Sequence, residues 1–194
     1  MKRIVFLIAV LLIGSSIIYA KTYDFESNDL GWNESVESEN GDVLIKEGVL
    51  SIEGKNDGFL SSTCYLPIDV KKSFEIKVDA FAKKIKDDAG FGVIFNCRDA
   101  YNYEMFLMTE KIVCYRRYEK GILVGERIDR IKFKKSKKAQ ISMHLKKSFD
   151  TVILVVDDVQ VLEIPYVDYK YSGFGFFVAG KQSITFDNLE TIIK

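Results

Sequence analysis

Residues Ser172–Ile193 read SGFGFFVAGKQSITFDNLETII, and this stretch decides the fold class of the chain. Two apolar runs, Phe174–Ala179 and Ser183–Phe186, flank the turn Gly180–Gln182. Aromatic and β-branched residues favour strands, and a glycine-containing turn between two such runs is typical of a hairpin. The stretch therefore predicts a closing β-hairpin.

The chain between residue 20 and this hairpin repeats the pattern of short apolar strands and polar turns. In Ser73–Ala82, apolar residues alternate with charged ones, which is the period of a half-buried strand. No amphipathic stretch of helical length interrupts the pattern, which favours an all-β, two-sheet antiparallel sandwich. The expected strands are Thr22–Phe25, Val43–Lys46, Val49–Ile52, Phe59–Leu66, Ser73–Ala82, Phe91–Cys97, Tyr103–Met108, Ile112–Tyr118, Ile122–Arg127, Ala139–Leu145, Thr151–Val156, Val159–Ile164, Gly173–Val178 and Ser183–Ile192.

The first twenty residues have the composition of a secretory signal peptide. Lys2 and Arg3 precede the uninterrupted apolar run Ile4–Ile13, and a small residue, Ala20, ends the segment. We expect cleavage after Ala20, which leaves residues 21–194 as a single domain in an exported protein, located in the periplasm, on the cell surface or outside the cell. The alternative is an uncleaved membrane anchor, because the apolar stretch is close to the shortest that spans a bilayer.

The nearly neutral net charge of the chain gives no indication of a nucleic-acid partner, and none is expected. Without Lys2 and Arg3, 26 of the 28 basic residues remain against 28 acidic ones, a formal charge of −2. The basic residues nevertheless cluster late in the chain. Two interpretations stay open for the cluster: lysines that protect a strand edge, or a patch for an acidic partner. It comprises Arg127, Arg130, Lys132, Lys134, Lys135, Lys137, Lys138, Lys146 and Lys147.

Three cysteines, Cys64, Cys97 and Cys114, are most simply interpreted as small buried apolar residues. A third expected strand separates Cys97 from Cys114, which disfavours a disulfide between them. Zinc is disfavoured because the chain has no Cys-x-x-Cys pair and its one histidine is His144.

Four pieces of the chain occur in a characteristic order. They are Asp24–Glu26 with Gly31-Trp32, Gly90–Asn96 followed by Asn102–Phe106, the hairpin Val152–Val161, and the closing segment Gly173–Ile192. Together they resemble the jelly-roll modules of the concanavalin A-like lectin and glucanase superfamily, especially laminin-G-like modules of exported bacterial proteins. The resemblance implies a two-sheet antiparallel jelly roll over residues 21–194. It leaves the function open, because sugar hydrolases and binding domains share this sandwich.

Glucanases of this fold that retain anomeric configuration carry a Glu-x-Asp-x-x-Glu strand, whose nucleophile and acid lie about 5–5.5 Å apart. This chain has no such triplet. Glu75 and Asp79 share a strand face, but Lys77 lies between them, as on an ordinary solvated face. The missing motif favours a protein that is not an enzyme, with a divergent glycoside hydrolase as an alternative.

The main candidate site lies on a three-strand meander. We expect a five-residue loop between Cys97 and Tyr103 and a two-residue turn, Glu110-Lys111, between Thr109 and Ile112. The numbers of two residues that face each other across the strands then sum to 200 in the first hairpin and to 221 in the second. The core face would then carry Phe91, Val93, Phe95, Tyr103, Met105, Leu107 and Cys114. The opposite face would carry one row of Asn96, Glu104 and Arg117 and a second row of Ile94, Phe106 and Tyr115.

In jelly rolls the face away from the core forms the floor of a concave groove. An amide, an ion pair and an aromatic ring on that floor suit a sugar, because a few placed polar groups complete a largely apolar site. The alternatives are an ordinary cross-strand ion pair and aromatic residues that act as burial anchors. The candidate ligand-binding residues are Asn96, Glu104, Phe106, Tyr115, Arg117 and Trp32.

We expect no cofactor. Calcium stays open as an alternative, because Asp99 and Asn102, Asp157-Asp158 and Asp187-Asn188 lie in turns, and calcium needs six or more converging oxygens.

The sequence therefore predicts an exported, non-catalytic module that binds a carbohydrate or another surface partner. A structural envelope protein with an acidic partner is a further alternative, and contact with the membrane is expected only through an uncleaved signal segment.

Overall fold

The computed structural model describes residues 19–82, 88–131, 139–149, 151–165 and 169–194. All regular elements in these ranges are strands, as expected. They are β1 (Tyr19–Tyr23), β2 (Gly41–Lys46), β3 (Val49–Gly54), β4 (Phe59–Tyr65), β5 (Phe74–Ala82), β6 (Gly90–Asp99), β7 (Asn102–Met108), β8 (Ile112–Glu119), β9 (Ile122–Arg130), β10 (Ala139–Lys147), β11 (Thr151–Val156), β12 (Val159–Pro165), β13 (Gly173–Ala179) and β14 (Ser183–Ile193).

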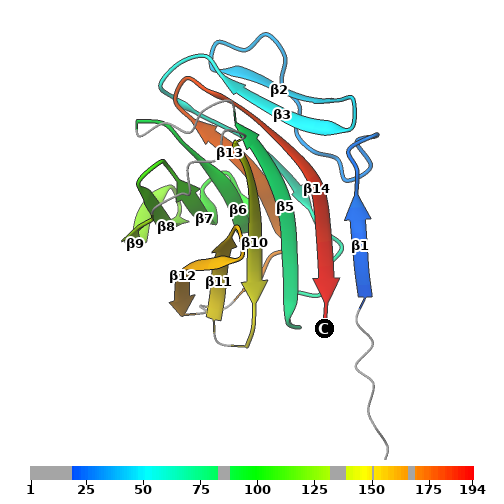
Figure 1. The fold of residues 1–194 in the computed structure, drawn as a ribbon, viewed down its shortest axis with the longest axis vertical. Coiled ribbons are helices and arrows are strands. Elements are labelled where there is room, and N and C mark those ends of the chain that lie inside the picture. Colours follow the sequence, from blue (N-terminus) through cyan, green and yellow to red (C-terminus); the bar gives the residue numbers. More distant parts are fainter. Residues whose placement is uncertain (1–18, 83–87, 132–138, 150, 166–168) are drawn as a thin grey trace, which may run out of the picture.

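The strands form two antiparallel sheets stacked as a sandwich (Figure 1). The eight-stranded sheet has the order β12-β11-β10-β5-β14-β3-β2, and β1 also pairs with β14. The six-stranded sheet has the order β4-β13-β6-β7-β8-β9. The predicted two-sheet antiparallel fold is confirmed.

The closing hairpin occupies the interior of both sheets. Its first strand, β13, lies between β4 and β6, while its second, β14, lies between β5 and β3. The alternate side chains that point between the sheets are buried, and the Phe176 and Phe186 rings stack at a centroid distance of 4.3 Å. A stacked aromatic pair buries a large apolar area, so this contact joins the two layers at their centre.

The core between the sheets follows the alternation that the sequence predicts. On β5, Phe74, Ile76, Val78 and Ala80 face inward, and the charged residues between them are partly exposed. Cys64 lies in the same core, and Cys97 and Cys114 are buried as well. All three are free thiols, as we expected for small buried apolar residues.

The register of the second meander hairpin is confirmed, but that of the first is wrong. Glu104 pairs with Arg117 between β7 and β8, which gives the expected sum of 221. Between β6 and β7, Phe95 pairs with Glu104, so the sum is 199 instead of 200. The hairpin has no five-residue loop. Instead, Asp99 pairs with Asn102, and a β-bulge between Phe95 and Asp99 takes up the extra residues.

This one-residue shift exchanges the two faces of β7, because side chains alternate along a strand. Phe106 joins Phe91, Val93 and Phe95 in the main core. The residues expected in the core from β7 and β8, namely Tyr103, Met105, Leu107 and Cys114, lie on the outer face instead. There Met105 packs with Ile94, Cys97 and Phe177 in a second, smaller cluster, against which Tyr103 and Leu107 also pack.

The N-terminal prediction falls mostly outside the described residues. Residues 1–18 are not described, and Tyr19 and Ala20 begin β1, which pairs with the end of β14. In the described ranges no helix is long and apolar enough to cross a membrane.

Candidate functional site

Asn96, Glu104 and Arg117, which were predicted as one row, lie close together with Tyr115 of the predicted neighbouring row, but on the inner face of the six-stranded sheet. The Glu104 carboxylate accepts a hydrogen bond of 2.8 Å from Asn96 Nδ2 through one oxygen and one of 2.8 Å from Tyr115 Oη through the other. Arg117 lies directly opposite Glu104 on the neighbouring strand. The expected assembly is present, although the face is the wrong one.

Asn96 occupies the bulge and links three parts of the chain. It has a φ of 48°, a conformation that asparagine tolerates better than most residues. Its side-chain oxygen accepts hydrogen bonds from the backbone N–H groups of Lys170 and Tyr171 at 2.9 and 3.1 Å. Its own backbone N–H donates to the Tyr169 hydroxyl at 3.2 Å. Asn96 thus holds the segment before β13 against the meander.

Glu104 is only 6% exposed. Burial raises the pKa of its carboxyl, and the hydrogen bonds from Asn96 and Tyr115 oppose this shift, together with the nearby Arg117 charge. Burial also raises the pKa of Tyr115, which keeps its hydroxyl protonated as a donor. Arg117 forms its ion pair with Glu119, so the expected Glu104–Arg117 ion pair is not formed. The row is a buried polar network that leaves little carboxylate surface for a ligand.

The other two candidate residues are in the core. Phe106 is fully buried and stacks on Phe95 at 5.0 Å. Trp32 is 4% exposed and stacks on Phe176 at 5.2 Å, with Phe25 on its other side. Neither ring presents a surface to a ligand, and both are burial anchors.

A groove on the outer face of the six-stranded sheet offers more accessible chemistry. It has a volume of about 580 Å³ and crosses β4, β13 and β6. One wall is the segment from Leu30 to Asn33, and the other is the β6–β7 hairpin with Arg98 and Tyr103. Its remaining lining is Phe59, Ser61, Thr63, Cys64, Tyr65, Ile94, Cys97, Asp99, Ala100 and Gly173.

Tyr65 is the most accessible aromatic ring in this groove, at 65% exposure. Its hydroxyl donates to the Arg98 carbonyl at 3.2 Å, so the side chain reaches across β13 from β4 to the end of β6. It passes Gly173, its partner on β13. An added Cβ at Gly173 would overlap the Cys97 carbonyl oxygen, so only glycine fits there.

This groove was not predicted from the sequence, since Tyr103 was expected in the core and Tyr65 was assigned no role, whereas both line the groove. A signal was present in the sequence. Glycines alternate on one face of β13, at Gly173 and Gly175, and also on the neighbouring β6, at Gly90 and Gly92. Of these four glycines only Gly173 lines the groove, because Leu107 and Phe177 lie against Gly90 and Gly92.

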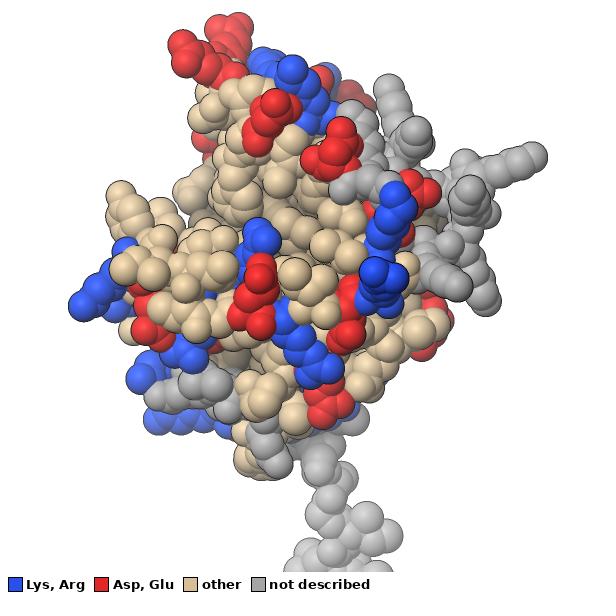
Figure 2. All heavy atoms as spheres, turned by 90° about the vertical axis from the view of Figure 1, so that its left-hand side faces the viewer, with Lys and Arg blue, Asp and Glu red and all other residues tan. Residues whose placement is uncertain are grey.

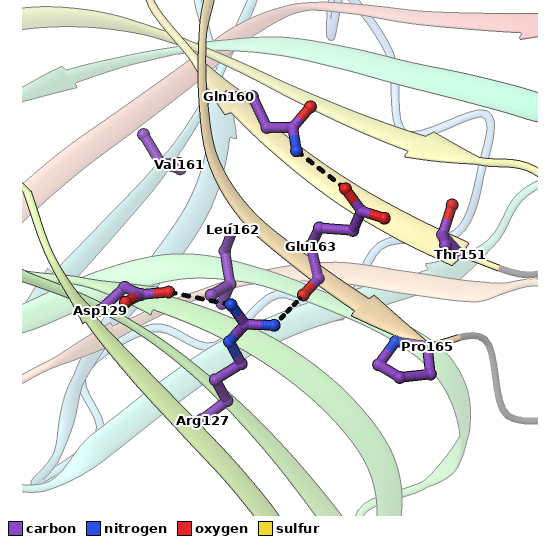
Figure 3. A pocket seen from close by; sticks show the side chains of 8 residues that line it. All are labelled: Arg127, Asp129, Thr151, Gln160, Val161, Leu162, Glu163 and Pro165. Atoms are coloured by element: carbon purple, nitrogen blue, oxygen red, sulfur yellow. Dashed lines mark hydrogen bonds and ion pairs between the residues drawn. The ribbon is translucent and has the colours of Figure 1, made fainter.

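Further cavities include two that are lined by polar side chains of the meander. One, of about 370 Å³, is bordered by Asn96, Glu104 and Arg117 together with Lys120 and Tyr171. The other, of about 460 Å³, lies between β9 and β12 (Figure 3). Arg127 reaches across it from β9, and its Nη1 donates to the Glu163 carbonyl at 2.6 Å.

The polar side chains that line the cavity in Figure 3 already have partners within the protein. Asp129 lies 3.4 Å from Arg127 Nη2, and Gln160 Nε2 donates to the Glu163 carboxylate at 2.9 Å. Arg127 therefore ties the edge of one sheet to the edge of the other. These contacts stabilise the open side of the sandwich and use the polar groups that a ligand would need.

The basic cluster, interpreted as edge-protecting lysines or as a patch for an acidic partner, is described only in part. Lys132, Lys134, Lys135, Lys137 and Lys138 lie outside the described residues. Lys147 is buried, and its Nζ donates to the backbone carbonyls of residues 70–72. Figure 2, which faces the β9 and β12 side, shows basic side chains interspersed with acidic ones in the described surface.

No group of three or more His, Cys, Asp or Glu side chains is placed to hold a metal within the described ranges. Asp99, one of the residues considered for calcium, accepts hydrogen bonds from Arg98, Asn102 and the backbone N–H of Tyr101. These contacts hold the pKa of Asp99 at about 2. The carboxylate serves to close the β6–β7 turn.

Comparison with known proteins identifies the fold. No family model matches the chain, and no curated protein matches it. A Bacillus subtilis protein of unknown function with a galectin-like fold is 12% identical with a TM-score of 0.59, over 90% of this chain and 96% of that one.

Two further solved structures agree. A Bacillus licheniformis β-glucanase is 10% identical with a TM-score of 0.59, over 90% of this chain and 98% of that one. Sheep galectin-11, in a complex with glycerol, is 14% identical with a TM-score of 0.51, over 70% and 97%. At such low identity the likeness concerns the fold, and the chain has the concanavalin A-like jelly-roll fold that its sequence resembles.

Proposed function

We propose that this protein is an exported, non-catalytic carbohydrate-binding module whose ligand lies in the outer-face groove beside Tyr65. The single observation that carries the proposal is the groove itself, about 580 Å³ in volume, with an exposed aromatic ring and several polar side chains on its walls. Sugar rings present apolar C–H faces and polar hydroxyls, and this combination matches them.

The polar groups of the groove are placed on both sides of the aromatic ring. Ser61 and Thr63 lie on β4 beside Tyr65, and Asn33 Nδ2 donates to Thr63 Oγ1 at 3.2 Å. Arg98 and Asp99 lie across the groove as an ion pair at 2.7 Å. These side chains offer both donors and acceptors to hydroxyl groups.

The positions and pKa shifts of Glu104 and Asp99 support binding without hydrolysis. Glu104 is buried on the opposite face of the sheet, and Asp99 in the groove is held at a low pKa by its hydrogen-bond donors. A general acid needs a pKa near the working pH, which Asp99 does not have. The shared fold with a β-glucanase and with galectin-like proteins supports a carbohydrate ligand and leaves its identity open.

The test is a glycan and polysaccharide array with residues 21–194, followed by titration of the best ligand. We expect Tyr65→Ala to weaken binding by about tenfold or more, which corresponds to about 1.4 kcal/mol. Tyr101→Ala is the matched control, because Tyr101 is 66% exposed and does not line the groove. Equal binding by wild type and Tyr65→Ala would remove this groove from consideration, and no binding across the panel would reject a carbohydrate ligand.

Export is the second part of the proposal. Removal of residues 1–20 would leave Lys21, Thr22 and Tyr23 of β1, which pair with Thr191, Glu190 and Leu189. The shortened strand keeps its place beside β14. We expect N-terminal sequencing of the protein expressed with residues 1–20 to begin at Lys21, whereas a sequence beginning at Met1 would show that the segment is retained.

A further inference from the structure

The strand β9 is an unusually exposed sheet edge. It runs for nine residues at the free end of the six-stranded sheet, and within the described residues its only strand partner is β8 (Figure 1). An edge strand presents unpaired backbone N–H and C=O groups that another strand can join. Four large apolar side chains are also exposed along it, at Ile122, Leu123, Val124 and Ile128.

The other long edges of the sandwich have partners across them. The backbone of Ser35 bonds to Val43 on β2, and the Asn33 N–H donates to the Thr63 carbonyl on β4. On β12, the Glu163 carbonyl accepts a hydrogen bond from the Arg127 guanidinium, a side chain that comes from β9 itself. In the described part of the chain no backbone hydrogen bond joins the outer edge of β9 to another segment. Among the described residues, the backbone groups on this edge are therefore free to pair with another strand.

The charge pattern of β9 matches a second copy of the same strand. Antiparallel pairing centred on Ile128 places Glu126 opposite Arg130 of the second copy and Arg127 opposite Asp129 of the second copy. Cross-strand partners share a face, so each of these pairs brings opposite charges together. Parallel, in-register pairing would instead place each charged residue beside the same residue of the second copy, so that like charges would meet. We propose that the protein forms a two-fold symmetric dimer through antiparallel β9–β9 pairing about Ile128.

This dimer goes beyond carbohydrate binding and does not depend on it. Antiparallel pairing joins two six-stranded sheets into one continuous sheet, and corresponding faces stay on the same side. Each outer face carries the groove beside Tyr65, so both grooves would open toward the same side. Two sites on one side bind a repetitive surface more tightly than one site does. The β9–β9 pairing covers the five residues Glu126–Arg130 of each copy and leaves Ile122, Leu123 and Val124 outside it, so we expect a weak, concentration-dependent interface.

The register can be tested by crosslinking. At the two-fold axis Ile128 lies opposite itself, with Cα atoms about 4.5–5.5 Å apart, inside the range that a disulfide needs. We expect Ile128→Cys to give a disulfide-linked dimer under mild oxidation. Leu123→Cys is the control on the same strand, because its two copies would lie roughly 30 Å apart. The native cysteines are buried and do not compete.

A charge exchange tests the pairing without a new bond. Glu126→Arg and Arg130→Glu should each weaken the dimer at least about tenfold in sedimentation equilibrium, because each places like charges together. The double variant restores opposite charges between copies and should recover the dimer. Glu126 also forms an ion pair with Arg116 within the chain. That contact is lost in both Glu126→Arg and the double variant, so it does not account for a difference between them.

The controls lie on another edge. Val159→Lys changes an exposed apolar residue of β12, at 60% exposure against 51% for Ile128, and should leave the dimer intact. A protein that stays monomeric at about 100 μM, a crosslink at Leu123→Cys that equals the one at Ile128→Cys, or a double variant that fails to recover would overturn the proposal. Loss of glycan binding alone leaves every one of these readouts unchanged.

Discussion

The hydroxyl of Tyr115 donates a 2.8 Å hydrogen bond to the carboxylate of Glu104, a residue that is buried on the inner face of the six-stranded sheet. The other carboxylate oxygen accepts a hydrogen bond from Asn96 Nδ2. The side-chain oxygen of Asn96 in turn accepts one from the backbone N–H of Lys170, in the segment before β13. A buried carboxylate is costly unless it is hydrogen-bonded, so these contacts make the network a structural centre of the meander.

Removal of one donor should therefore destabilise the protein. We expect Tyr115→Phe to lower the free energy of unfolding by about 1–3 kcal/mol, because it leaves one Glu104 oxygen unsatisfied while the ring stays in place. Urea denaturation measures the effect. Tyr101→Phe, which changes an exposed hydroxyl, is the control and should stay within about 0.5 kcal/mol of wild type.

The same carboxyl should make stability depend on pH. Burial raises the folded-state pKa of Glu104 above its ordinary value of 4.5, so the folded protein binds this proton more tightly than the unfolded chain. The resulting stabilisation is complete below pH 4.5 and is lost as the pH rises through the folded pKa. Glu104→Gln removes this titration.

Denaturation of both proteins between pH 4 and pH 8 gives the measurement. Wild type should gain stability relative to Glu104→Gln as the pH falls, since the difference isolates one carboxyl from all others. A difference that is constant over this range, or that grows as the pH rises, would contradict a raised pKa.

Lys147 should contribute to stability rather than to a binding patch. Its Nζ donates to the carbonyls of Val70, Lys71 and Lys72 at 3.1, 3.4 and 2.8 Å, and the residue is 4% exposed. We expect Lys147→Met to cost about 1–3 kcal/mol, because the buried carbonyls lose a charged donor. Lys46→Met, at an exposed position, is the control for loss of a charge. Equal stability of the two variants would show that the three bonds add nothing.

Trp32 should report folding and not ligand binding. The ring is packed between Phe25 and Phe176, so Trp32→Ala should cost about 3–5 kcal/mol through the cavity it leaves. Trp32→Phe keeps most of the packing and should cost less. As the sole tryptophan, Trp32 provides a fluorescence signal that follows unfolding directly. Full stability of Trp32→Ala would show that the ring is dispensable for the core.

The strands could be predicted from the sequence because apolar and polar residues alternate along them. Ser73–Ala82 illustrates this, since its four inward side chains are those that the period of two selects. The second meander hairpin was predictable for a related reason. Its two-residue turn at Glu110-Lys111 fixes the pairing of every residue that follows.

The first hairpin could not be predicted because its register depends on one backbone conformation. Asn96 adopts a positive φ within the bulge, and nothing in the alternation of neighbouring residues signals that extra position. Because of this bulge, Glu104 lies on the inner face of the sheet and not on the outer face, where it was expected. The groove beside Tyr65 was missed in turn, because glycines such as Gly173 mark a depression only once the neighbouring strands are known.

The central position of the closing hairpin has a consequence for the order of folding. Residues before Gly173 supply the meander β6–β9, the four strands β5, β10, β11 and β12, and the hairpin β2–β3, but neither sheet is continuous without β13 and β14. Both strands follow every other strand of the domain in the chain, so each sheet stays divided into two parts until they pair. Completion of the two layers therefore depends on pairings between the closing hairpin and strands that precede it by many residues.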